Sequence, residues 1–488
     1  MSSSGASAGL TDFADIQGVV RFGHGHMTAA CFYVLRIADP AAARAWIAGT
    51  PVTSAATSDP PPETAVQIAL TTEGLTALGL STSAMAGFSA EFRSGLVGDP
   101  DRSRRLGDVD DNDPSGWRWG YGDRVPHVLV MIYTIPSRFD AWQEQIKTVR
   151  WAQAFSVITC LDTADMDGRE PFGFIDGISQ PALDWDRRLQ AAKTELAYRD
   201  DVALGEFVLG YPNEYGKYTD RPLLDPSADP HALLPWAEDA PGKRDLGRNG
   251  SYVVFRDLRQ SVDAFWTYLR EQAAASGLTA EQLAERLVGR TLRDGNPLLP
   301  SDAGGGTEPV APARNDFDFN ADPSGSVCPL GAHIRRANPR AADVPPGTVG
   351  WLQRLVQTLG LNKQAPRDDL MASSRFHRIL RRGREYGQAG DEVGLRFLCV
   401  NGNIARQFEF VQSAWIMSTK FNGMTNESDP LLGNRQPIEG CPVTSMYTYT
   451  REGGVRRRLA GVPQFVTVCG GGYFFLPGLR ALKYLASL

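Results

Sequence analysis

Apolar residues near the N-terminus follow the spacing of strands and helices. The run QGVVRF at 17–22 predicts a short strand, and the longer run AACFYVLRI at 29–37 predicts a second one after a Gly-rich turn. Asp39 and Pro40 come next and mark a helix start, because Asp caps free N–H groups and Pro fits the first helical position. This part of the chain therefore predicts strand, turn, strand and helix in that order.

A similar pattern recurs in the middle of the chain. SYVVFR at 251–256 predicts a strand, and a helix that ends near Gly277 is predicted by four apolar residues at helical spacing, Val262, Phe265, Trp266 and Leu269. Residues 33–46 are similar to residues 252–266, since each stretch has a Tyr-containing strand followed by a Trp in the helix. The similarity suggests a duplicated α+β unit.

A third strand and helix are predicted at 394–415. GLRFLCVNGN predicts the strand, and the helix after it carries Ile404, Phe408, Val411 and Trp415 on one face. With 3.6 residues per turn Glu409 points away from that face, so we expect Glu409 to be solvated and Trp415 to lie in the core.

The domain boundary is predicted in segment 213–249, which is rich in Pro, Asp and Gly and has little periodicity. We therefore expect an N-terminal domain over 1–212, a loop-rich connection over 213–249 and a C-terminal domain over 250–488. Strands and helices in mixed order favour an α+β fold over a regular βαβ arrangement.

Composition narrows the partners. The chain has 488 residues and a formal charge of -6, so no basic surface indicates binding to nucleic acid or to an anionic membrane. The longest apolar stretch, 128–135, is too short to span a bilayer. The first nine residues lack the basic and apolar regions of a signal peptide, so we expect a soluble cytoplasmic protein.

The six cysteines are far apart and form no C-x-x-C motif. Most of them lie in apolar runs, so we expect buried, reduced thiols, which fits a cytoplasmic protein better than a disulfide framework does.

Two segments carry candidate chemistry. In EPFGFIDGISQP (170–181), Asp176 is surrounded by apolar residues, which disfavour the charged carboxylate and suit a group that shuttles a proton. The alternative is a turn residue that caps its own backbone before Gly177. In CPLGAHIRRANPR (328–340), His333 could ligate a metal inside a porphyrin whose propionates meet Arg335, Arg336 and Arg340, or it could be a structural histidine near a turn.

Together these segments resemble the dye-decolorizing peroxidases, a family of haem enzymes. The G-x-x-D-G element of that family is matched by Gly173, Asp176 and Gly177, and the segment around His333 is similar to the one that supplies the proximal haem ligand. Further similar stretches lie at 246–256, 379–383, 394–397, 406–408 and 429–433. The resemblance covers nearly the whole chain, and the long, loop-rich C-terminal half is similar to the larger bacterial and fungal subgroup.

The resemblance implies two ferredoxin-like domains, each an antiparallel sheet with helices, with haem b held mainly in the C-terminal half. It also implies a haem b peroxidase that reduces hydrogen peroxide and takes single electrons from aromatic or dye-like donors. We expect a monomer or a small homo-oligomer.

Roles for individual residues follow from the same resemblance. His333 would be the ligand to the haem iron, with Asp429 as the acid that supports it. Asp176 would take a proton from hydrogen peroxide and return it to the leaving oxygen, while Arg381 stabilises the developing negative charge. The other implied haem contacts are a propionate pair with Arg340 and apolar walls from Leu395 and Phe397.

Several alternatives remain open at this point. Arg382 could replace Arg381, His377 could replace His333, and Glu409 could replace Asp429. Bulky donors would pass electrons through the haem edge or a surface Tyr or Trp, for which Tyr386 is the first candidate. A related haem enzyme acting on oxychlorine anions or porphyrin carboxylates, or a haem carrier, is the competing function.

Overall fold

The computed structural model of the chain describes seven ranges: 11–189, 200–300, 314–340, 373–388, 390–437, 443–450 and 454–488. Its main sheet has the strand order β10-β12-β9-β15-β2-β3-β1-β4, and β11 also pairs with β12. Every strand pair in this sheet is antiparallel.

The N-terminal half of the sheet is one ferredoxin-like unit. Its four strands are β1 (Ala29–Ile37), β2 (Thr64–Leu70), β3 (Val128–Thr134) and β4 (Phe155–Asp162). They lie in the order fourth, first, third, second along the sheet. Helix α2 (Pro40–Gly49) follows the first strand, and α7 (Phe139–Ile146) and α8 (Val149–Ala154) precede the fourth.

The C-terminal half repeats this order. Its strands are β9 (Ser251–Gln260), β10 (Leu380–Arg381) with β11 (Arg384–Tyr386), β12 (Gly394–Asn401) and β15 (Val466–Leu476). Here too the fourth strand lies beside the first, then the third and the second. Helices α9 (Val262–Ser276) and α10 (Ala280–Val288) follow the first strand. The predicted α+β fold with two ferredoxin-like units is thus confirmed, and the similar stretches 33–46 and 252–266 begin the two units.

The remaining helices and strands are mostly short. The helices are α1 (Gly18–Phe22), α3 (Thr72–Ala77), α4 (Thr82–Met85), α5 (Ala90–Ser94), α6 (Pro100–Leu106), α11 (His333–Ala337) and α13 (Leu479–Ala486). The short strands are β5 (Ala182–Asp184), β6 (Asp201–Ala203), β7 (Leu223–Leu224), β8 (Arg244–Asp245), β13 (Tyr447–Thr450) and β14 (Arg456–Leu459).

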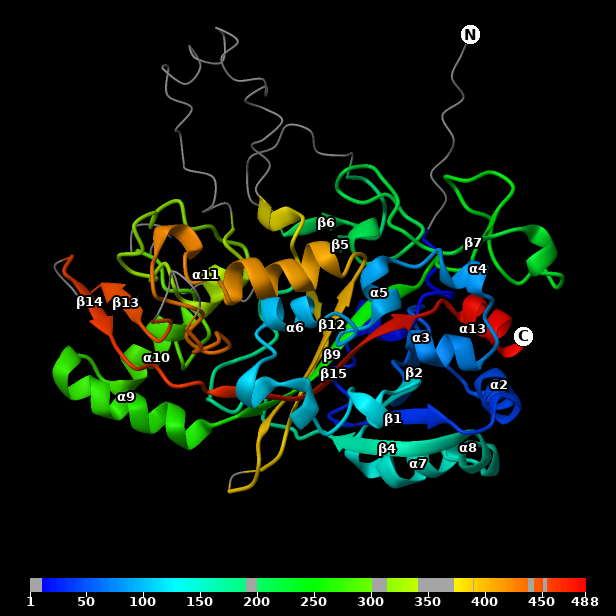
Figure 1. Cartoon of the computed structure of the whole chain (residues 1–488), viewed down its shortest axis with the longest axis horizontal. Helices are drawn as coiled ribbons and strands as arrows, with labels where there is room; N and C mark the ends of the chain where they lie inside the picture. The colour runs from blue at the N-terminus through cyan, green and yellow to red at the C-terminus, as the bar shows by residue number, and fades with distance from the viewer. Residues whose placement is uncertain are drawn as a thin grey trace, which may run out of the picture.

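The two units join edge to edge. Phe475 of β15 lies opposite Leu70 of β2, which makes one continuous sheet. The chain then continues into α13, which packs on α2 of the first unit. Figure 1 shows this path, with the red β15 running from the half that carries α9 and α10 to the blue half of the molecule.

The burial of strand β1 on both faces explains why its sequence is apolar at successive positions. The strand is buried on both faces over most of its length. On one face Tyr33 packs with Trp151 of α8, and the two ring centroids are 5.2 Å apart. On the other face Phe32 packs with Phe255 of β9 at 5.6 Å. A strand covered on both sides needs apolar residues at every position rather than at alternate ones.

Two predicted helix boundaries are confirmed, the start of α2 and the end of α9. The carboxylate of Asp39 accepts hydrogen bonds from the backbone N–H groups of Ala41 and Ala42 at 2.8 and 3.0 Å. Gly277 ends α9 with a φ of 70°, a left-handed conformation that Gly adopts without steric cost.

The strand predicted over 17–22 is wrong, because this segment forms helix α1. A short apolar run has no periodicity that separates a strand from one turn of buried helix. Gly23, with a φ of 63°, ends the helix in the left-handed region.

The expectation that Glu409 is solvated is also wrong. The segment after β12 forms two π-helical stretches, η9 (Ala405–Glu409) and η10 (Val411–Ile416), so its side chains do not follow a 3.6-residue wheel. Glu409 instead forms an ion pair with Arg102 at 2.7 Å and accepts a hydrogen bond from the hydroxyl of Tyr473 at 2.9 Å. Trp415 is buried, as expected.

The prediction of reduced thiols is wrong for one pair of cysteines. Cys31 of β1 and Cys160 of β4 form a disulfide, whereas Cys328, Cys399 and Cys469 are free and buried. The pairing was hidden because 129 residues separate the two cysteines and strand pairing alone brings them together. The cysteines therefore no longer support a cytoplasmic location, which stays a prediction from the N-terminal sequence.

Segment 213–249 packs against the folded units. Leu224, Leu234 and Leu246 from this segment are buried in the same core as Trp46 and Trp151. The domain boundaries at 212 and 250 stay a prediction. Across the described ranges, no helix combines the length and the apolar character that a membrane crossing requires.

The junction between the units gives a test of stability. Phe475 is fully buried, and its ring lies 5.0 Å from that of Phe88. We expect Phe475→Ala to lower the free energy of unfolding by about 3–5 kcal/mol, because it leaves a cavity at the junction between the units. The control Val149→Ala, at an exposed position, should change it by less than about 0.5 kcal/mol in the same denaturant titration. Equal effects of the two substitutions would show that side-chain packing at this junction does not stabilise the fold.

Candidate active site

A large cavity lies in the second unit, between the sheet and the helices that cover it. Its volume is about 1410 Å³, counted with its open mouth. The walls come from β9, β12, α10, α11, η10 and the loop around Asp176. Five of the residues predicted from the sequence line this one cavity: Asp176, His333, Arg381, Leu395 and Phe397.

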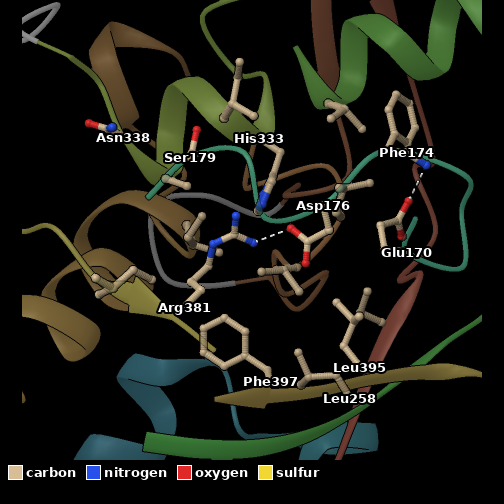
Figure 2. Close-up of a pocket in the computed structure, with 18 of the residues that line it drawn as sticks. Glu170, Phe174, Asp176, Ser179, Leu258, His333, Asn338, Arg381, Leu395 and Phe397 are labelled. Atoms are coloured by element: carbon tan, nitrogen blue, oxygen red, sulfur yellow. Dashed lines mark hydrogen bonds and ion pairs between the residues drawn. The ribbon is translucent and has the colours of Figure 1, made fainter. Parts of the chain in front are cut away.

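The loop that carries Asp176 crosses from the first unit to the second. Phe172 stacks on Phe265 of α9 with ring centroids 4.4 Å apart. Gly173 and Gly177 have φ values of 103° and 76°, so both glycines of the G-x-x-D-G element stand where a side chain would be strained. The two turns leave Asp176 facing the cavity, as Figure 2 shows.

Glu170 holds this loop in place. Its carboxylate accepts hydrogen bonds from the backbone N–H groups of Phe172 and Phe174 at 3.0 and 2.9 Å. It also accepts one from the side-chain amide of Gln260 on β9 at 2.7 Å. Burial raises the pKa of Glu170 to about 7, in spite of these three donors.

Asp176 and Arg381 form an ion pair of 2.7 Å. Burial acts to raise the pKa of Asp176, but the guanidinium of Arg381 and the backbone N–H of Gly177 hold it below its usual value. Asp176 is therefore a carboxylate at neutral pH and can accept a proton. The reading of Asp176 as a mere turn residue does not account for its charged partner on β10.

His333 begins helix α11 and is oriented by Asp429. The Nδ1 atom of His333 lies 3.0 Å from Oδ2 of Asp429, which is fully buried. The other oxygen of Asp429 accepts hydrogen bonds from the backbone N–H groups of Leu431 and Leu432, each at 2.9 Å. Because Asp429 takes Nδ1, the opposite ring nitrogen of His333 faces the cavity, in which Figure 2 places Asp176 and Arg381.

Leu395 and Phe397 form an apolar wall. They alternate along β12 with the buried residues Arg396 and Leu398, so the strand period of two puts both on the cavity face. Leu258 lies opposite Leu395 on β9 and completes this wall.

The arginines after His333 do not all behave as expected. Arg335 pairs with Asp322 and donates to the backbone carbonyl of Cys328, while Arg336 donates to the carbonyls of Trp415, Ser418 and Glu427. Both are buried away from the cavity, so the expectation that they meet haem propionates is wrong. Both arginines follow His333 by less than one turn of α11, so their side chains leave the helix in other directions than that of His333.

Arg340 is held by a neighbouring segment. It donates to the carbonyl of Phe317 at 3.0 Å and to the side-chain oxygen of Asn315 at 2.8 Å, and its guanidinium lies 3.9 Å from the ring centroid of Phe317. It also donates to the hydroxyl of Ser179, which lines the cavity, at 3.3 Å. Arg340 is thus connected to the cavity through its hydrogen bond to Ser179.

The alternatives that the sequence left open have other partners. Arg382 donates to the backbone carbonyls of Val19 and Val20 in α1. His377 bonds the carbonyl of Arg406 and stacks on Phe410, with ring centroids 3.6 Å apart. Arg381 and His333 are therefore the residues that face the cavity.

Tyr386 is not a surface residue. Only 5% of it is exposed, and the guanidinium of Arg396 covers its ring at 3.5 Å. Its hydroxyl donates to Glu392 at 3.4 Å. The expectation of a surface relay at this position is wrong, because β11 pairs with β12 and buries the side chain.

Sequence reasoning missed Arg290, Glu170 and Gln260, all of which line the cavity. Glu170 stands in the same segment as Asp176, so its spacing from Gly173 was a signal that could have found it. Arg290 follows Gly289 at the end of α10 and belongs to none of the recognised motifs.

The arrangement can support two kinds of chemistry. An imidazole whose other nitrogen is fixed by a buried carboxylate is a good metal ligand. Across the cavity, a carboxylate beside a guanidinium can exchange a proton with a small substrate and stabilise negative charge on it.

Comparison with curated proteins gives relatives of similar length. The multifunctional dye peroxidase DyP2 of Amycolatopsis sp. is 28% identical over 442 residues, which cover 86% of this chain and 81% of that protein. The dye-decolorizing peroxidase msp1 of Mycetinis scorodonius is 27% identical over 529 residues, covering 100% of this chain and 90% of that protein. No protein-family model matches the chain.

Solved structures with the same fold include the DyP-type peroxidase of Anabaena sp., with a TM-score of 0.71 at 24% identity over 97% of this chain and 94% of that one. A decolorizing peroxidase from Auricularia auricula-judae gives a TM-score of 0.69 at 24% identity over 97% of this chain and 100% of that one. These structures share the two-unit fold described above.

Glu170 gives a test by pH. Its pKa of about 7 in the folded protein lies above the ordinary 4.5, so the folded state keeps a proton that the unfolded state loses between these values. We therefore expect the stability of the wild type relative to Glu170→Gln to fall by about 3 kcal/mol as the pH rises from 4.5 to 7.

Denaturant titrations at several pH values measure this difference. The control is Glu144→Gln, at an exposed position on α7, which should change by less than about 0.5 kcal/mol over the same range. If the Glu170→Gln difference were independent of pH, the carboxyl group would not be protonated in the folded protein.

Proposed function

The chain belongs to the dye-decolorizing peroxidase family, and we propose that it is a haem b peroxidase that uses His333, Asp176 and Arg381. One hydrogen peroxide would take up two electrons and two protons to give two waters, and each of two aromatic or dye-like donors would supply one of the electrons. The ion pair between Asp176 and Arg381, in the cavity that His333 faces, carries this proposal.

The residues present fit a haem. His333 offers a ring nitrogen to the cavity while Asp429 holds the other one. The cavity walls around it are largely apolar and include Ile334, Val411 and Leu432, which suit the faces of a porphyrin. Haem bound there would supply the iron that takes up the two oxidising equivalents of peroxide.

Asp176 and Arg381 would act on the peroxide. The carboxylate would take a proton from one oxygen of the peroxide and return it to the other oxygen, which would then leave as water. Arg381 offsets the negative charge that builds up while the O–O bond breaks and keeps Asp176 ionised until the peroxide arrives.

The apolar wall would limit which molecules reach this place. With a haem in the cavity, the bulk of Leu258, Leu395 and Phe397 would narrow the space that remains on their side. Aromatic donors would therefore deliver electrons from outside the pocket, while a small peroxide enters it.

The ligand assignment predicts an optical change. Purified protein should show the Soret band of bound haem, and His333→Ala should remove it or shift it to that of a loosely held haem. His377→Ala is the matched control, because this histidine stacks on Phe410, and its Soret band should stay unchanged. A native band in His333→Ala would contradict the assignment.

The acid–base assignment predicts a kinetic change. Asp176→Ala should slow the reaction of the holo-protein with peroxide by about 10²- to 10⁴-fold in stopped-flow absorbance, with haem still bound. The exposed Asp165→Ala, in the preceding loop, should react at the wild-type rate. An unchanged rate for Asp176→Ala would reduce Asp176 to a turn residue.

A further inference from the structure

One end of the cavity is positively charged. Arg290 lines it and is 4% exposed, and Arg340 and Arg381 lie close enough to act on its charge. Figure 2 shows Ser179 and Asn338 on one side of His333, with Glu170 and Phe174 on the other. The charged end is the side of Ser179, because the hydroxyl of Ser179 accepts a hydrogen bond from Arg290 at 2.9 Å.

Arg290 contacts no carboxylate among the described residues. Its guanidinium donates to the backbone carbonyls of Gly295 and Arg314, at 2.8 and 3.0 Å, and to Ser179. Burial, together with the charges of Arg340 and Arg381, lowers the pKa of Arg290 to about 9. A buried cation is normally paired with an anion, because burial without a partner is costly.

Ser179 links this arginine to Arg340. Its oxygen accepts hydrogens from both guanidinium groups, at 2.9 Å from Arg290 and 3.3 Å from Arg340. The hydroxyl hydrogen of Ser179 has no acceptor in the part of the chain that the structure describes. A carboxylate entering this end would thus meet a guanidinium and an O–H donor together.

We propose that Arg290 and Ser179 bind a propionate carboxylate of the haem, and that Arg340 positions Ser179 for this contact. The inference rests on the proposed haem function and changes one expectation, because Arg340 was expected to bind the propionate directly. Arg290 lines the cavity, whereas Arg340 does not.

The test compares haem b with its dimethyl ester, in which both carboxylates are blocked. Each is loaded into the full-length wild type, Arg290→Leu, Arg290→Lys and Arg293→Leu. Arg293 is the matched control, because its exposed side chain lies three residues away and pairs with Asp294. The loss of haem to an excess of apomyoglobin is followed by absorbance.

We expect Arg290→Leu to release haem b about 10- to 100-fold faster than the wild type. The dimethyl ester should leave both proteins at rates within about threefold of each other, and Arg293→Leu should behave as the wild type with both ligands. Arg290→Lys keeps a charge and should recover part of the retention of haem b.

Two results would overturn the inference while leaving the haem function intact. In one, Arg290→Leu holds haem b as firmly as the wild type does. In the other, it releases haem b and the dimethyl ester with the same acceleration, which would indicate a general loosening of the pocket. A wild type that shows no Soret band would instead overturn the proposed function, and this inference with it.

Circular dichroism and a thermal unfolding scan check that each variant folds. If Arg290→Leu does not fold, Ser179→Ala decides the question, because it removes the O–H donor and leaves all three arginines in place. It should release haem b about three- to tenfold faster with no matching effect on the ester. Equal retention of haem b by Ser179→Ala and the wild type would then overturn the inference.

Discussion

The ion pair between Asp176 and Arg381 joins two segments that are 205 residues apart. Asp176 comes from a loop after the first unit, and Arg381 comes from β10 of the second. Burial alone would favour a neutral Asp176, so its charge depends on Arg381. Glu170 fixes the loop to β9 through Gln260, which makes the position of the pair a property of the junction between the loop and the second sheet. The chemistry of the cavity therefore requires both halves of the chain.

The two units use the same face of their sheets differently. In the first unit, helices α2 and α8 pack directly on that face, where Trp46 and Trp151 lie with ring centroids 5.2 Å apart and fill the space. In the second unit, Leu258 and Phe397 on the equivalent face line the cavity, and α10 and α11 form its far side. The same fold therefore has a solid core on this face in one unit and a cavity on it in the other.

Sequence reasoning located the residues whose local motif determines what they do. Asp176 and His333 were found because each stands in a short segment that resembles an element of the dye-decolorizing peroxidases, and both line the cavity. It failed where the direction of a side chain depends on packing between distant segments. Arg335 and Arg290 are examples, since one turns into the protein and the other faces the cavity with no motif around it. The disulfide between Cys31 and Cys160 failed to be predicted for the same reason, because strand register brings the two residues together.

The contact between Asp429 and His333 determines which ring nitrogen of His333 faces the cavity. Burial acts to raise the pKa of Asp429, but the imidazole of His333, Arg336 and the backbone N–H of Leu432 lower it below its ordinary value. Asp429 is therefore an acceptor, so the hydrogen bond assigns the proton of the imidazole to Nδ1. In the neutral imidazole the lone pair is then on the nitrogen that faces the cavity. The carboxylate also makes the ring a stronger electron donor, and a metal bound there would be easier to oxidise. The buried acid thus prepares the histidine side of the cavity, as Arg381 prepares Asp176 on the other.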